Sequence, residues 1–209
     1  MRPAILTEIK YLLPWGVLTV VVAGLVAAAT PANGISDYSL MCLGLGCAIL
    51  AARAFGKERL RVETATESPE NVRTIRMSAV SITTLAAAAA FSLMSAKARV
   101  PHGLSVPLLA VLSSTPALGI VPYLTVRTRK PFAAVVFSAF IVGAIKIASC
   151  VVVRIVYGPE ALADGYMAGD WQTAKLMISL FWSGTVFVSF VLAFACARQF
   201  VPTPVPTET

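Results

Sequence analysis

The chain has 209 residues, of which 57% are hydrophobic and only 13% are charged, and its mean hydropathy is +0.80. This composition excludes an ordinary soluble domain, because a water-soluble fold of this size cannot hide so much apolar surface. A net charge of +7 would suggest a nucleic-acid partner in a soluble protein. Here the basic residues lie mostly between hydrophobic runs, so we interpret them as topology signals and expect no nucleic-acid partner.

Six apolar runs emerge when the sequence is cut at its charged clusters. Each run is close to the roughly 20 residues that a helix needs to cross a hydrocarbon core about 30 Å thick. The alternating pattern of a membrane barrel is missing, and alanine-rich stretches favour helix. The prediction is therefore all-α: a polytopic membrane bundle of about six transmembrane helices, in one domain over residues 1–201. The predicted spans are residues 12–30, 38–55, 77–96, 104–126, 132–153 and 176–197.

The two ends of the chain flank these spans. The lead before the first span contains Glu8 and Lys10, which favours an interfacial helix over a cleaved secretory signal. After the last span, residues 202–209 alternate proline with Thr and Val. Proline cannot continue a helix, so we expect a short extended tail there.

Orientation follows from the Lys and Arg residues other than Lys146. Twelve of them fall on one predicted side, and only four, Lys97, Arg99, Arg154 and Lys175, fall on the other. Cytoplasmic loops carry the excess of positive charge. Both termini are therefore predicted to be cytoplasmic, in a multi-pass protein of the cell membrane, most simply a bacterial inner membrane.

The sequence lacks the residues that several kinds of chemistry require. The chain has no GxxxxGK[ST] phosphate loop, so it is not expected to be an ATPase by itself. Its four cysteines lack metal-site spacing and it has a single histidine, His102, so we expect neither a metal nor another cofactor. All ten acidic residues lie outside the runs, which weakens an ion-coupled carrier. We expect no enzyme activity.

Two residues within the runs are candidates for a substrate pathway. Lys146 is the one ionisable side chain well inside a predicted span, where a charge costs about 3 kcal/mol. It either contacts a pathway or extends its ammonium group to the outer interface. Pro116 lies in the fourth run between Pro107 and Pro122. Prolines interrupt helical hydrogen bonds, so this run is either a gate or pathway helix or a static kink.

The most distinctive stretch is the polar loop from Arg53 to Arg76, which reads RAFGKERLRVETATESPENVRTIR. Ser68 and Pro69 can end one short helix and start another, which predicts a helical elbow on the membrane surface. The loop resembles the corresponding segment in membrane-spanning permease subunits of the type-2 ATP-binding-cassette transporter family. The residues that match the family pattern are Phe55, Gly56, Glu58, Ser68, Pro69 and Arg73.

This resemblance implies a specific role and also has departures. It implies that the loop docks into a separate ATP-binding subunit and that two six-span subunits, as a homodimer or heterodimer, form the pathway between them. The family's glycine-threonine pair is missing, and its apolar patch is replaced by residues 64–67 (TATE). A docking surface that has diverged and a purely topological likeness both fit these departures. The alternative function is a non-catalytic structural membrane subunit of a respiratory or photosynthetic complex.

We predict that the C-terminus is cytoplasmic, because basic residues are three times more numerous on that predicted side. Thr209→Cys, in a background without the four native cysteines, should react with a membrane-impermeant maleimide only after the membrane is opened. Labelling of intact cells would show that the orientation is inverted.

Overall fold

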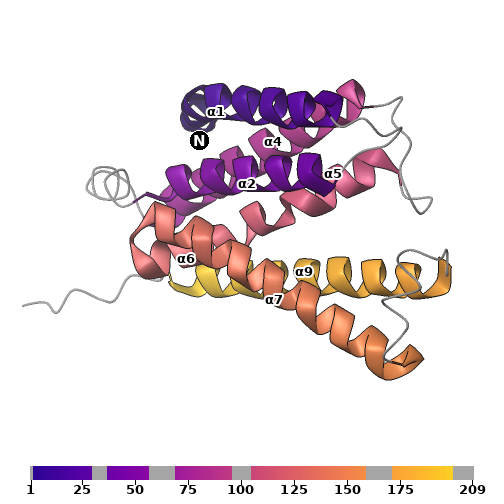
Figure 1. Cartoon of the computed structure of the whole chain (residues 1–209). Coiled ribbons are helices and arrows are strands. Elements are labelled where there is room, and N and C mark those ends of the chain that lie inside the picture. Colours follow the sequence, from indigo (N-terminus) through magenta and orange to yellow (C-terminus); the bar gives the residue numbers. More distant parts are fainter. Residues whose placement is uncertain (1, 30–36, 57–68, 96–104, 159–170, 200–209) are drawn as a thin grey trace, which may run out of the picture.

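The computed structural model describes residues 2–29, 37–56, 69–95, 105–158 and 171–199. Within these residues every regular element is a helix, and the helices lie alongside one another in a bundle (Figure 1). α1 begins and α9 ends at the same end of the bundle (Figure 1). The elements are α1 (Arg2–Ala29), α2 (Asp37–Ala54), α4 (Pro69–Met94), α5 (Val106–Ser114), the 3-10 turn η2 (Thr115–Leu118), α6 (Ile120–Thr128), α7 (Pro131–Tyr157) and α9 (Trp171–Gln199).

Five helical stretches are long and apolar enough to cross a membrane: Ala4–Ala29, Asn71–Met94, Val106–Thr128, Pro131–Tyr157 and Gln172–Arg198. The sixth predicted span is α2, whose apolar stretch, Tyr38–Ala54, is shorter. Its 18 residues correspond to a length of about 27 Å, slightly less than the hydrocarbon thickness. The chain is thus a multi-pass helical membrane protein, as predicted, with five full-length spans and one short one.

The helices extend further than the predicted spans at several ends. The lead before the first span belongs to the single helix α1, which contains Pro14. α4 begins at Pro69, eight residues before the predicted start of the third span, because it carries Arg73 and Arg76 beyond the apolar stretch. The polar loop is therefore shorter than predicted, since its first and last residues belong to α2 and α4.

α2 lies at the centre of the bundle. It packs against α1, α4, α5, η2, α6 and α7. Leu43, Cys47, Leu50, Ala51 and Ala54 are fully buried along it, at the spacing of one helical face. Close contact with its neighbours uses small residues: a side chain added at Gly46 would collide with Thr19 of α1. A short helix can be held in the membrane by such packing.

The fourth span is broken, and its prolines mark where each piece begins. Pro107 and Pro116 each occupy one of the first two positions of α5 and η2, and Pro122 is the third residue of α6. At the start of a helix the missing N–H of proline costs little. The predicted kink is therefore a two-step break around η2.

Hydroxyl groups donate to backbone carbonyls next to this break. The Val111 carbonyl, among the last four of α5, accepts from Ser114 at 2.8 Å and also from Thr115. Ser113 and Ser114 both donate to the Ala110 carbonyl, at 3.0 and 2.9 Å. Thr115 donates to the Val111 carbonyl at 3.2 Å. In a regular helix residue 116 would donate its N–H to the Leu112 carbonyl, but it is a proline, and the Thr115 N–H takes this place.

Two glycines bring neighbouring helices against the break. A Cβ atom at Gly44 of α2 would lie 2.7 Å from the Ser113 carbonyl oxygen. A Cβ atom at Gly119, between η2 and α6, would lie only 1.8 Å from the Ser189 carbonyl oxygen of α9. The irregular backbone is therefore covered by protein on two sides, as an interruption at membrane depth requires.

α7 and α9 form the outer part of the bundle. Only 11% of the apolar stretch of α7 and 17% of that of α9 is buried, against 50% for the broken span. Figure 1 shows α7 diverging from α9 along its length. Large apolar side chains such as Phe140, Ile155 and Phe190 are exposed on these two helices, where a lipid environment or another membrane segment can cover them.

We predict that Gly119→Ala destabilises the bundle by about 1–3 kcal/mol or more, because the new methyl group would collide with backbone that cannot rotate away. The same substitution at Gly143 is the control, since no atom lies within 4 Å of a Cβ atom there. Thermal unfolding in detergent, followed by size-exclusion chromatography, measures both. Equal midpoints for the two variants would contradict the tight contact between η2 and α9.

Candidate functional site

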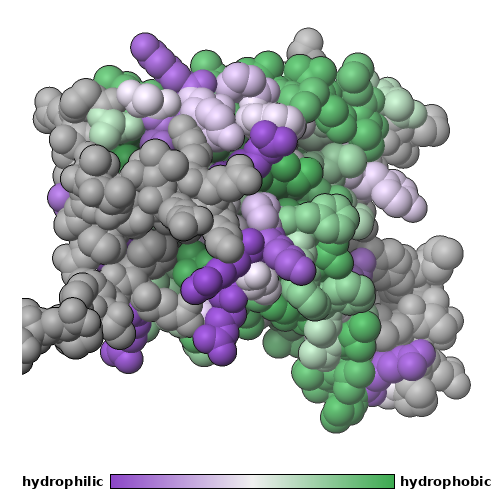
Figure 2. Space-filling model, turned by 90° about the vertical axis from the view of Figure 1, so that its left-hand side faces the viewer, coloured by the Kyte–Doolittle hydropathy of each residue, from purple (hydrophilic) through white to green (hydrophobic). Residues whose placement is uncertain are grey.

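The basic end of the bundle is the end at which α2 and α9 finish, α4 begins and α6 turns into α7. Figure 2 faces this end and shows hydrophilic side chains gathered near its middle, with hydrophobic surface at the flanks. Where side chains are described, the basic residues that these elements carry at this end are Arg53, Arg73, Arg76, Arg127, Arg129, Lys130 and Arg198. Of the predicted coupling residues, the described ones lie here.

Arg76 holds the end of α2. Its side chain is only 1% exposed, and its guanidinium donates to the carbonyl of Ala54. Ala54 is the last residue of α2, so its carbonyl has no partner within the helix. The positive charge also lies at the negative end of the helix dipole, which is worth about 0.3–1 kcal/mol or more. Arg76 therefore supplies a hydrogen-bond donor to the carbonyl at a helix end that water does not reach.

Arg73 makes the equivalent contact with α9. Its guanidinium donates to the carbonyl of Ala197, which is among the last four residues of α9. Residues three apart lie on neighbouring positions of a helix surface, so Arg73 and Arg76 reach two different helix ends from one side of α4. The start of α4 thus ties the ends of α2 and α9 together.

Phe55 and Gly56 follow directly after α2. Phe55 is fully buried and belongs to the hydrophobic core. A Cβ atom on Gly56 would lie 3.6 Å from the Pro131 ring, at the start of α7. One turn before the end of α2, the Arg53 guanidinium lies 3.7 Å from the centre of the Trp15 ring of α1, in a cation–π contact. The structure brings Phe55, Gly56 and Arg73 to one end of the bundle.

Three predicted coupling residues remain, Glu58, Ser68 and Pro69. Glu58 and Ser68 lie outside the described residues. Pro69 is the first residue of α4, which agrees with the predicted helix start. The docking role of the loop stays a prediction. The residues on either side of it, Phe55 and Arg73, are held by the contacts described above.

The two candidate pathway residues occupy different environments. Pro116 is buried within η2, in contact with the core of the bundle. Lys146 is exposed near the middle of α7, on the outer part of the bundle. Its long stem can carry the ammonium group toward an interface. The structure does not bring these two residues together.

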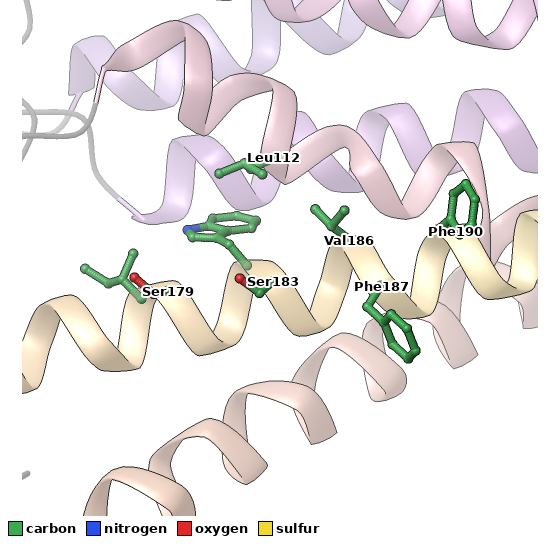
Figure 3. A pocket seen from close by; sticks show the side chains of 8 residues that line it. Leu112, Ser179, Ser183, Val186, Phe187 and Phe190 are labelled. Atoms are coloured by element: carbon green, nitrogen blue, oxygen red, sulfur yellow. The ribbon is translucent and has the colours of Figure 1, made fainter.

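A groove lies away from the basic end, between α5 and α9 (Figure 3). Its volume is about 550 Å³, within the range of small-molecule sites. It is largely apolar and its lining holds no charged residue. The lining residues are Leu112, Ile178, Ser179, Trp182, Ser183, Val186, Phe187 and Phe190.

The described residues hold no cluster of His, Cys, Asp and Glu that could bind a metal. The four cysteines are unpaired. Cys47 and Cys196 are buried, and the Cys150 sulfur lies 3.8 Å from that of Met177, where α7 meets α9. These thiols act as packing groups in the described structure.

Sequence reasoning missed two features of the site. It assigned Arg73 to the loop and overlooked that Arg73 and Arg76 can reach helix ends, although an arginine in the first turns of a span beside two closing helices is a usable signal. It also missed the groove. Neighbouring serines and a tryptophan at 179, 182 and 183 carry polar atoms into an apolar helix, which was the available sign.

No protein-family model matches this chain, nor does any curated protein or solved structure.

We predict that Arg76→Met destabilises the protein by about 1–3 kcal/mol, because the buried Ala54 carbonyl loses its donor. Arg198→Met is the control: Arg198 is exposed and contacts only the Phe194 ring among the described residues, at 4.5 Å, so its loss should cost less than about 1 kcal/mol. Thermal midpoints in detergent decide between them. If Arg198→Met proved as unstable as Arg76→Met, the bond from Arg76 to Ala54 would have no special role in stability.

Proposed function

We propose that this protein is the permease subunit of an ATP-binding-cassette transporter of the type-2 class. Two such subunits, as a homodimer or heterodimer in a bacterial inner membrane, would form the substrate pathway. A separate ATP-binding subunit would dock at the basic end through residues 57–68 and drive the cycle. The chain itself then carries no covalent chemistry and needs no cofactor.

The observation that carries this proposal is the fixed frame around residues 57–68. On one side Phe55 is buried in the core, and on the other side Arg73 and Arg76 bind α4 to the ends of α9 and α2. A partner that moves this connection acts on three helices at once, because they are joined at that end. Such a frame suits a coupling element better than a passive connection.

The lack of carboxylates agrees with an external energy source. Glu8 is the one acidic residue with a described side chain in the five long spans. It lies in the first two turns of α1, far from the membrane centre. Ion-coupled carriers commonly use a carboxylate near the middle of the membrane, so hydrolysis of ATP by a partner is the simpler way to drive transport.

The structural-subunit alternative draws on a different observation. The exposed apolar faces of α7 and α9 could pack against helices of a larger complex as well as against lipid. That function would need no docking at the basic end. The two hypotheses therefore differ in what binds residues 57–68.

We predict that tagged protein, purified in mild detergent from its native membrane, carries an ATPase with a phosphate-loop motif. Glu58→Lys should reduce the retained ATPase tenfold or more, because reversing a charge opposite a complementary partner costs several kcal/mol. Glu160→Lys is the matched control, with the same charge change on the opposite predicted side. Arg73→Glu is a poorer probe, because it also breaks the contact with Ala197.

Membrane expression and thermal midpoint of each variant control for folding. Equal ATPase retention and equal ATP hydrolysis with Glu58→Lys and wild type would reject coupling through residue 58. Co-purification of other integral membrane subunits without an ATPase would favour the structural-subunit function.

A further inference from the structure

We propose that the groove between α5 and α9 binds a neutral amphiphile, a largely apolar molecule that carries a hydroxyl, ester or similar hydrogen-bonding oxygen. The idea that this ligand is the transported molecule rests on the proposed function. The idea that it binds in the groove rests only on the structure of the groove. The argument uses the unpaired polar groups of the groove, their depth, the lack of charge and the shape.

Three polar groups in the groove have no internal partner. Within the described part of the chain, no hydrogen bond joins the hydroxyls of Ser179 and Ser183 or the indole N–H of Trp182 to another group. Most other span hydroxyls donate to a carbonyl of their own helix. Thr185, two residues after Ser183, donates to the Phe181 carbonyl at 2.8 Å. The groove therefore gathers hydrogen-bonding capacity that its own helix does not use.

These groups lie deep in the membrane. Trp182 is eleven residues after the start of α9 at Trp171, which places it about 16 Å along the helix. At that depth there is no water to pair an N–H group, and leaving one unpaired is unfavourable. An acyl chain alone cannot remove this cost, whereas an oxygen in the ligand can.

The groove also lacks charge. None of its eight lining residues is ionisable, and Lys146 lies on α7 outside the lining. A charged headgroup at this depth would need a counter-charge that the lining does not supply. The lining thus selects a neutral polar group over a phosphate or an ammonium.

The groove follows one side of α9. Figure 3 shows Leu112 pointing from α5 toward α9, Val186 and Phe190 pointing to that side of α9, and Phe187 turned to the side of α7. The lining runs from Ile178 to Phe190, or about 18 Å along the helix. An elongated apolar molecule can lie along this length with its oxygen beside the unpaired groups.

The test uses purified protein in phosphatidylcholine nanodiscs and a diacylglycerol that carries a photoreactive diazirine on one acyl chain. We expect cross-links concentrated on the α5 and α9 peptides that contain Leu112 and residues 178–190. Unlabelled diacylglycerol should compete and phosphatidic acid should not. No ATPase partner is present, so this result is independent of the pull-down that tests the proposed function.

Trp182→Phe keeps an aromatic ring and removes the N–H donor. It should lower groove labelling about fivefold, the equivalent of one hydrogen bond of about 1 kcal/mol. Trp15→Phe is the matched control, a second partly exposed tryptophan that lies on α1 outside the groove, and it should leave labelling unchanged. Ser179→Ala with Ser183→Ala gives an independent measurement should Trp182→Phe fold poorly.

Several results would overturn the proposal. Labelling that follows exposed surface equally over α7 and α9 would mean that only bulk lipid covers the groove. Full labelling of both the Trp182→Phe variant and the double serine variant would show that hydrogen bonds from these residues do not contribute to ligand binding. Equal competition by phosphatidic acid would refute neutrality, and cross-links between α9 helices of two copies would make a second copy the occupant.

Discussion

Backbone carbonyls that have no water to bind control the architecture of this bundle. Inside hydrocarbon each carbonyl and N–H must find a partner in the protein, and a broken helix or a helix end leaves several without one. Ser113, Ser114 and Thr115 supply hydroxyl donors where the fourth span breaks. Arg73 and Arg76 supply guanidinium donors where α9 and α2 end. In both places polar side chains donate to backbone carbonyls, at positions that the pattern of apolar residues alone would not predict.

The arginine solution has a mechanical consequence. Because both arginines come from the first turns of α4, the ends of α2 and α9 are fixed relative to α4. Removing Arg76 would leave the buried Ala54 carbonyl without a donor, and removing Arg73 would break the bond to Ala197, so the three ends favour moving together over separating.

The sequence was sufficient for the fold class and insufficient for contacts. Apolar runs of span length predict helices in any membrane protein, and the prolines of the fourth run predicted its interruption. The predicted spans stop short of the helix ends where charged residues continue a helix past the apolar stretch, as at Arg73 in α4. Hydropathy marks the membrane boundary and does not mark the last helical hydrogen bond. α2 has 18 residues, as does its predicted span of residues 38–55, but its central place against six elements emerges only from packing.

The site was predicted in the same uneven way. Phe55, Gly56 and Arg73 were grouped through a resemblance, and the structure does bring them to one end, but the contact of Arg73 with Ala197 depends on how α4 and α9 are arranged. No periodicity in a single helix carries that information. The groove is harder still, since it is formed between α5 and α9, and η2, α6 and α7 lie between them in the chain.

The broken span joins the two regions of interest. Leu112 of α5 lines the groove, and the same span continues through η2 and α6 to the turn at Arg129, where the backbone adopts a left-handed conformation with φ of 57°. From there Pro131 lies beside Gly56, just after the end of α2, where an added Cβ atom would be 3.6 Å from its ring. A displacement at the basic end therefore has a continuous covalent and packed route to one wall of the groove. η2 is the point on this route where the regular helical hydrogen bonds are interrupted, because Pro116 has no N–H and the Thr115 N–H donates to the Leu112 carbonyl in its place.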